Sequence, residues 1–212
     1  MSKARKPWIV GITGASGVVY GVELCRELLR QRIPVHLIVT DAGWRVLKDE
    51  LGWDTSDRTA ELRQQLDPAE GLLTLHPVRD VGASVASGSF LTSGMVIVPC
   101  SMGTLSAVAR GASDNLLERA ADVVLKEGRP LLLVPRETPL HAIHLENMLI
   151  LARSGVKIIP AMPGFYHQPR SLEDIVRFLV GKILDMMDVE HDMYTRWGAH
   201  TNESISDTDR PD

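Results

Sequence analysis

Short runs of apolar residues alternate with helical patterns along almost the whole chain, and this alternation limits the fold more than any other feature. The apolar runs occupy residues 8–13, 35–40, 94–99, 130–135 and 156–160. Runs of this kind are typical of strands buried on both faces, in a parallel sheet covered by helices. Helix-like spacing of apolar residues fills 18–29, 42–50, 104–110, 115–126, 140–154 and 172–187. The sequence therefore predicts an α/β fold with a doubly wound parallel sheet and helices on both faces.

The chain contains no internal repeat and no linker, so we expect one domain over residues 1–197. Asp41 is the expected cap of the helix over 42–50, because a carboxylate accepts well from the first N–H groups of a helix. The polar, poorly periodic stretch 53–79 predicts loops with at most a short helix. Almost no apolar residue occurs from 198 to 212, which predicts a mobile, polar tail.

Charge and cysteine content argue against several classes of protein. The formal net charge is −4, with 23 Lys and Arg against 27 Asp and Glu, and no long basic run occurs, so we expect no nucleic-acid partner. The apolar runs are far shorter than the about 18–20 residues that cross a bilayer, so we expect no membrane span. Cys25 and Cys100 form no CxxC pair, which argues against a disulfide framework and favours a reducing, cytoplasmic location.

Small polar residues follow three of the predicted strands, at the edge where doubly wound folds bind their ligands. The first loop, GITGASG at 11–17, lets a phosphate approach the backbone and leads into a helix whose N–H groups favour an anion. A tight turn that requires small residues explains the same loop equally well. The second loop, PCSMGT at 99–104, contains Ser101 and Thr104, which are also plausible helix caps. Two such loops at one edge favour a shared phosphorylated ligand.

The third loop, residues 134–139, holds Arg136 and Glu137 between two prolines, which indicates either a ligand site or a structural ion pair. Tyr166 lies in another loop after a strand. Either its hydroxyl donates a hydrogen bond to an anion, or its ring packs against the rest of the loop. A possible metal pair, His141 and His144, has no third ligand at metal spacing, so we expect no metal site.

Several longer motifs occur in an order that is similar to one family. They are GITGASG at 11–17, SGSF at 87–90, GMVIVPCSMGT at 94–104, RAADVVLKEGRPLLLVPRETPL at 119–140, HLENML at 144–149, PAMPGFYHQP at 160–169 and RWG at 196–198. The chain resembles the UbiX-type flavin prenyltransferases, also described as phenylacrylic acid decarboxylase-like flavoproteins. The resemblance covers residues 7–197.

This resemblance implies a Rossmann/flavodoxin-like fold that assembles as a dodecamer with its active sites between subunits. It implies a metal-independent enzyme that joins the dimethylallyl group of dimethylallyl phosphate to reduced FMN, giving prenylated FMN, the cofactor of UbiD-type decarboxylases. Matching positions place FMN against Gly14, Ala15, Ser16, Thr40, Ser101, Met102, Gly103, Thr104 and Arg136. They place the donor phosphate against Ser87, Arg119, Lys126, Tyr166 and Lys182. The implied catalytic residues are Ser16, Glu50, Glu137 and Lys126, and the implied prenyl pocket contains Val81 and Trp197.

Two positions depart from the pattern of the family. Lys182 stands where an arginine is usual, which keeps the charge and loses the planar, bidentate grip on a phosphate. Val81 stands where some members have an aromatic residue, so a π face for an allylic cation is lost there. Two other functions stay open, an FMN-dependent decarboxylase of the cysteine-decarboxylating type and a non-catalytic FMN carrier. The choice between dimethylallyl phosphate and its pyrophosphate also stays open.

Overall fold

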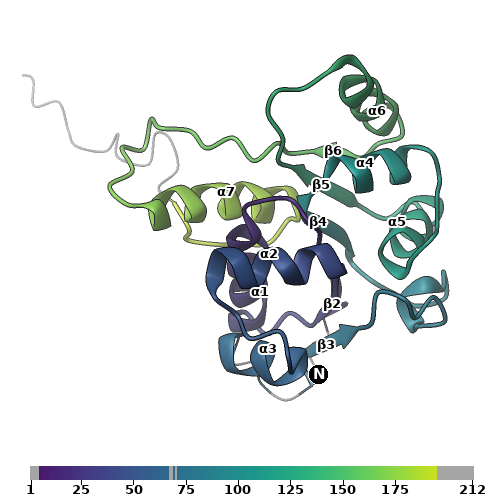
Figure 1. Ribbon diagram of the computed structural model, residues 1–212, viewed down its shortest axis with the longest axis horizontal. Coiled ribbons are helices and arrows are strands. Elements are labelled where there is room, and N and C mark those ends of the chain that lie inside the picture. The colour runs from purple at the N-terminus through teal and green to yellow at the C-terminus, as the bar shows by residue number, and fades with distance from the viewer. Residues whose placement is uncertain (1–4, 67–68, 70, 195–212) are drawn as a thin grey trace, which may run out of the picture.

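Within the residues that the structure describes, six parallel strands form one sheet in the order β3-β2-β1-β4-β5-β6 (Figure 1). The computed structural model describes residues 5–66, 69 and 71–194 of the chain. The strands are β1 (Trp8–Ile12), β2 (Val35–Val39), β3 (Leu73–His76), β4 (Gly94–Cys100), β5 (Leu131–Pro135) and β6 (Lys157–Ile158). The predicted parallel, doubly wound sheet is confirmed, and its strand order is that of the Rossmann type.

In the described part of the chain, seven α-helices and one short 3₁₀ helix cover the two faces of the sheet. One face carries α1 (Val18–Arg30), α2 (Asp41–Leu51), α3 (Arg58–Leu66) and α7 (Leu172–Met186). The other carries η1 (Ser84–Ala86), α4 (Met102–Ala109), α5 (Leu116–Lys126) and α6 (Ala142–Arg153). Figure 1 shows the two groups of α-helices on opposite sides of the strands. Neighbouring strand residues point to opposite faces, so Val10 packs in the first core and Ile9 in the second.

The structure differs from the sequence-based expectations mainly between residues 53 and 79. This stretch contains α3 and the edge strand β3, whereas we expected loops with at most a short helix. None of the residues of β3 is fully buried, so the strand lacks the continuous apolar character by which the central strands were predicted. The cap of α2 is Thr40, whose hydroxyl accepts from Gly43 N at 3.0 Å, and the assignment of that role to Asp41 was wrong. Asp41 is the first residue of the helix.

Within the described residues no helix combines the length and apolar character that crossing a membrane requires. Cys25 and Cys100 are both buried free thiols, and burial raises the pKa of Cys25 to about 12. The predicted tail, residues 198–212, and Trp197 lie outside the described residues.

Candidate functional site

Thr13 joins the first two polar loops at the carboxyl ends of β1 and β4. Its hydroxyl donates to the carbonyl oxygen of Pro99 at 2.8 Å and accepts from Ser101 N at 2.8 Å. The side chain is 1% exposed. The strand order reverses between β1 and β4, and ligands of doubly wound sheets bind at such a point. This positioning role of Thr13 was not predicted, although a polar residue directly after a buried strand was a signal for it.

The loop after β4 begins a helix through the cap that we expected at Ser101. The Ser101 hydroxyl accepts from Thr104 N at 3.3 Å, so capping explains this serine at least in part. Thr104 is not a cap, because it lies within the first turn of α4. Among the described residues, and outside its own helix, a Cβ added at Gly103 would meet no atom within 4 Å, so the start of α4 is open there.

The GITGASG loop lies directly on the first turn of α2. A Cβ added at Gly14 would lie 2.6 Å from Ala42 Cβ, which no real structure tolerates without a shift. Gly14 and Ser16 are exposed, whereas Ala15 is buried. The loop therefore presents backbone and one hydroxyl outward, as a cradle for a phosphorylated ligand requires.

Glu50 occupies the amino terminus of α1. Its carboxylate accepts from Gly17 N at 3.0 Å and from Val18 N at 3.2 Å, although Glu50 lies 33 positions after Gly17. We expected these N–H groups to bind a phosphate. Glu50 also contributes, after burial, to the raised pKa of the Tyr20 hydroxyl. A phosphate at this edge must therefore bind the exposed loop beside the carboxylate.

Arg136 and Glu137 lie beside a cavity of about 330 Å³ at the ends of β5 and β6. Leu140 and Met148 form part of its apolar wall. Arg136 Nε is buried and has no hydrogen-bond partner, and no ion pair joins Arg136 to Glu137 in the part of the chain that the structure describes. A buried guanidinium nitrogen without a partner fits an anionic ligand better than it fits the structural ion pair.

Three of the predicted phosphate-binding residues lie at or near α5. Arg119 contacts Asp122 at 3.1 Å, Lys126 contacts Glu127 at 3.3 Å, and Ser87 shares a hydrogen bond of 2.9 Å with Ser89. Residues 127–130 alone separate the end of α5 from the start of β5. Lys126 therefore lies near the amino-terminal edge of the sheet, opposite the GITGASG loop.

Lys182 lies on the other face of the sheet. It belongs to α7, which packs into the core shared with α1, whereas α5 packs into the core shared with α4. Tyr166 is half exposed and contacts Phe178 of α7 edge-on, at 5.5 Å between ring centres. A single cluster of Arg119, Lys126, Tyr166 and Lys182 is therefore not formed within one chain. Val81 is 54% exposed, so within one chain it lines no closed pocket.

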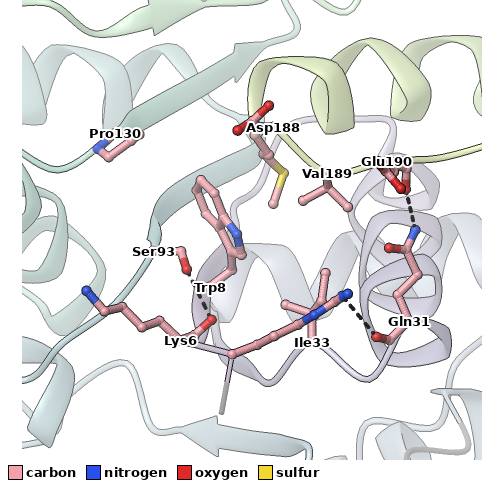
Figure 2. Close-up of a pocket in the computed structure, with 11 residues that line it drawn as sticks. Lys6, Trp8, Gln31, Ile33, Ser93, Pro130, Asp188, Val189 and Glu190 are labelled. Atoms are coloured by element: carbon pink, nitrogen blue, oxygen red, sulfur yellow. Dashed lines mark hydrogen bonds between the residues drawn. The ribbon is translucent and has the colours of Figure 1, made fainter. Parts of the chain in front are cut away.

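A larger hollow of about 700 Å³ lies at the opposite edge of the sheet (Figure 2). Trp8, Ser93 and Pro130 line it at the amino ends of β1, β4 and β5. Of the predicted site residues that the structure describes, none lines this hollow, and doubly wound sheets bind ligands at the carboxyl edge. We therefore place the candidate site at the carboxyl edge rather than in the larger hollow.

The rings of His141 and His144 lie 3.5 Å apart between their centres and are tilted by 30°. No group of three or more His, Cys, Asp or Glu side chains suited to a metal ion occurs among residues 5–66, 69 and 71–194.

The fold and the carboxyl-edge loops define a Rossmann-type protein of the kind that binds a phosphorylated cofactor. The family model described as Flavoprotein matches residues 1–184. The flavin prenyltransferase UbiX of Alkalihalophilus pseudofirmus is 57% identical over 196 residues, which are 92% of this chain and 98% of that protein. The chain therefore belongs to the Flavoprotein family and, within it, to the flavin prenyltransferases.

Two solved structures support the same relationship. A crystal structure of AnUbiX (PadA1) in complex with FMN and dimethylallyl pyrophosphate has a TM-score of 0.82 and 39% identity, and covers 91% of this chain and 97% of that one. A dodecameric FMN-dependent UbiX-like decarboxylase from Escherichia coli O157:H7 has a TM-score of 0.81 and 42% identity, and covers 90% and 98%.

Proposed function

We propose that this chain joins the dimethylallyl group of dimethylallyl phosphate to reduced FMN, and that prenylated FMN passes to a UbiD-type decarboxylase. The observation that carries the reaction is the match to a flavin prenyltransferase over 92% of this chain and 98% of the relative. The related AnUbiX structure contains FMN and a dimethylallyl donor, which supports the same pair of ligands here. The reducing compartment favoured by the two separate cysteines suits a reduced flavin.

The carboxyl-edge residues fit FMN. We assign the cofactor to the loop Gly14–Ala15–Ser16, to Thr40, to residues 101–104 and to Arg136. The exposed Gly14 backbone, the open start of α4 and the buried, unpartnered Arg136 Nε support this assignment. When bound, reduced FMN supplies the electron-rich ring atoms that accept the prenyl group. The protein binds and orients both reactants and excludes water.

The cationic residues stabilise the leaving phosphate. Breaking the allylic carbon–oxygen bond puts negative charge on the phosphate and positive charge on the dimethylallyl group, so fixed donors near the phosphate lower the barrier. We assign this role to Arg119 and Lys126, with Ser87, and to Tyr166 and Lys182. Because the sheet separates these two groups within one chain, we propose that different chains of an oligomer contribute them. The dodecameric relative supports such an assembly.

The two predicted carboxylates, Glu50 and Glu137, take part in proton transfer. The reaction releases a proton, which a carboxylate or the released phosphate accepts. Glu50 lies at the start of α1 beside Ser16, and Glu137 lies next to Arg136 at the cavity. We assign proton removal to this pair or to the released phosphate, and we place Val81 and Trp197 at the dimethylallyl group.

One experiment separates this reaction from the two alternatives. Purified protein is incubated with reduced FMN and either dimethylallyl phosphate or the pyrophosphate, and the flavin is weighed by mass spectrometry. We expect the mass of one added dimethylallyl group with the monophosphate. An unchanged flavin mass with both donors would favour a carrier or a decarboxylase.

Ser16→Asp is expected to weaken FMN binding at least tenfold. The substitution puts a second negative charge beside the cofactor phosphate and near the Glu50 carboxylate, and a tenfold loss corresponds to about 1.4 kcal/mol. Fluorescence titration with FMN measures it. Ser56→Asp, at another exposed serine, is the matched control and should bind FMN as wild type does. Equal affinity in both variants would place the phosphate elsewhere.

Lys182→Ala and Tyr166→Phe are expected to raise the donor concentration needed for half-maximal turnover. Each lost charge-assisted hydrogen bond costs about 1.5 to 3 kcal/mol, or about 10- to 100-fold in donor binding. Lys182→Arg should be tolerated, because a guanidinium grips two phosphate oxygens. Steady-state assays at saturating reduced FMN, with the donor varied, measure these effects. Unchanged donor dependence in Lys182→Ala would remove Lys182 from the site.

A further inference from the structure

Lys182 lies in a cluster of polar and aromatic side chains around the end of α7. The Tyr194 hydroxyl donates to one carboxylate oxygen of Asp185 at 2.5 Å. His191 Nε2 lies 3.1 Å from the other oxygen of that carboxylate. The ammonium of Lys182 lies 5.1 Å from the centre of the Tyr194 ring. A phenol therefore stands between a cation and a carboxylate.

The hydrogen bonds of this cluster have a defined direction. Met193 N donates to His191 Nδ1 at 3.1 Å, so Nε2 carries the ring hydrogen and donates to Asp185. The single hydroxyl hydrogen of Tyr194 goes to Asp185, which leaves the phenol oxygen as an acceptor for Lys182. The nearby Tyr194 phenol is the largest cause of the raised pKa of Lys182, and Tyr166 and Asp185 contribute less.

Gly181 lets the tyrosine ring reach this position. A Cβ added at Gly181 would lie 2.5 Å from Tyr194 Cδ1 and 2.9 Å from His191 Cε1. The ring of Tyr194 therefore packs directly on the helix backbone beside Lys182. His191 is fully buried at the same place. The rings of Phe178 and His191 also contact Tyr194, at 5.2 and 5.4 Å between ring centres, so the tyrosine has little room to move away from the lysine.

We propose that Tyr194 and Asp185 are positioning residues for Lys182, and that they hold its ammonium where it binds the phosphate of the prenyl donor. This inference rests on the proposed function, which places Lys182 at that phosphate. A lysine is a compact charge on a flexible four-carbon stem, so much of its binding energy is lost in ordering the stem. An anchor on one of the three ammonium N–H groups restricts the stem before dimethylallyl phosphate binds. The other N–H groups stay available for a phosphate oxygen.

Tyr194→Phe tests the anchor, because it removes the hydroxyl and keeps the ring. We measure the KM for dimethylallyl phosphate at saturating reduced FMN, and the Kd of dimethylallyl phosphate by calorimetry on protein loaded with oxidised FMN, where no turnover occurs. Both constants should rise about 3- to 10-fold, while kcat and FMN affinity change less than about twofold. A substitution that merely loosened the fold would move kcat and FMN affinity as well.

The same substitution in a Lys182→Ala background decides whether Tyr194 acts through Lys182. In the Lys182→Ala background, Tyr194→Phe should change donor binding less than about twofold, because the lysine that Tyr194 positions is gone. An equal rise in both backgrounds, or no rise in either, would overturn the proposal. Unchanged donor binding in Lys182→Ala alone would also overturn the proposal. Failure of the proposed function would be seen in a different measurement, as the absence of prenylated FMN with the wild-type chain.

Asp185→Asn provides a second arm that does not depend on the stability of Tyr194→Phe. It removes the charge that holds the tyrosine hydroxyl and should raise the donor Kd about threefold or more. Asp192→Asn is the matched control, since that carboxylate is 85% exposed and pairs with Arg30 at 3.7 Å. Equal donor affinity in Asp185→Asn and Asp192→Asn would contradict a role for Asp185.

Discussion

Two inactive variants of this chain, each damaged at a different edge of the sheet, are expected to recover activity when they assemble together. Ser16→Asp damages the carboxyl edge, and Lys126→Ala damages the end of α5 near the amino edge. One chain cannot bring Ser16 and Lys126 into one site, because the length of the sheet separates them. An oligomer can join the carboxyl edge of one chain to the α5 region of another.

The size of the recovery follows from counting intact sites. With equal amounts of both chains mixed at random, about a quarter of the sites combine an intact Ser16 with an intact Lys126. Lys126→Ala alone should lose about a hundredfold or more, as expected when a preorganised charge is lost. Ser16→Asp alone should turn over little when FMN is supplied near the wild-type Kd, because its FMN affinity is lower. The two chains are co-expressed with different tags, purified through both tags, and assayed for prenylated FMN by mass spectrometry.

Each variant co-expressed with itself under both tags is the control, and it should stay inactive. Hybrid oligomers that are no more active than these controls would show that one chain supplies the whole site. If light scattering showed a monomer and that monomer were fully active, the proposed assembly of the site from different chains would be contradicted.

Gly21→Ala is expected to destabilise the fold by about 3 kcal/mol. A Cβ at this position would lie 2.4 Å from the backbone oxygen of Val98 and 3.0 Å from Ile12 Cγ1, so α1 would have to move away from β4. Overpacking of this kind costs about 1 to 3 kcal/mol and occasionally more, whereas the better helix propensity of alanine returns only about 1 kcal/mol. The Val98 oxygen belongs to a central strand, so we expect a cost above the usual range, about 4 kcal/mol, and a net loss of about 3 kcal/mol.

Thermal unfolding at one protein concentration measures this loss. For a chain of this length, 3 kcal/mol lowers Tm by about 6 to 12 °C. Gly82→Ala is the matched control, because its new Cβ would meet only the Asp80 side chain at 3.5 Å, and its Tm should stay within about 2 °C. A Gly21→Ala variant with a Tm at or above that of wild type would show that α1 shifts without cost.

The central strands and the helices between them were predictable because their signals are local. Residues such as Ile97 and Leu133 stand in runs that are apolar at every position, and such runs are typical of strands buried on both faces. The edge strand β3 was missed for the same physical reason, since Thr74 is exposed and His76 is half buried. The loop residues Ser101 and Arg136 were also predictable, because small polar or charged residues followed buried strands.

The sequence by itself determined the succession of strands and helices along the chain, apart from α3 and β3, and the loops at the carboxyl edge, because hydrophobic periodicity and turn residues act over a few neighbouring positions. Only the tertiary structure decided which side chains meet. Glu50 reaches Gly17 N across 33 positions, and Thr13 joins Ser101 across 88. The sheet keeps Lys126 apart from Lys182, although both are basic residues of helices. Such contacts depend on strand order and on the face to which each helix crosses, and no local pattern records either.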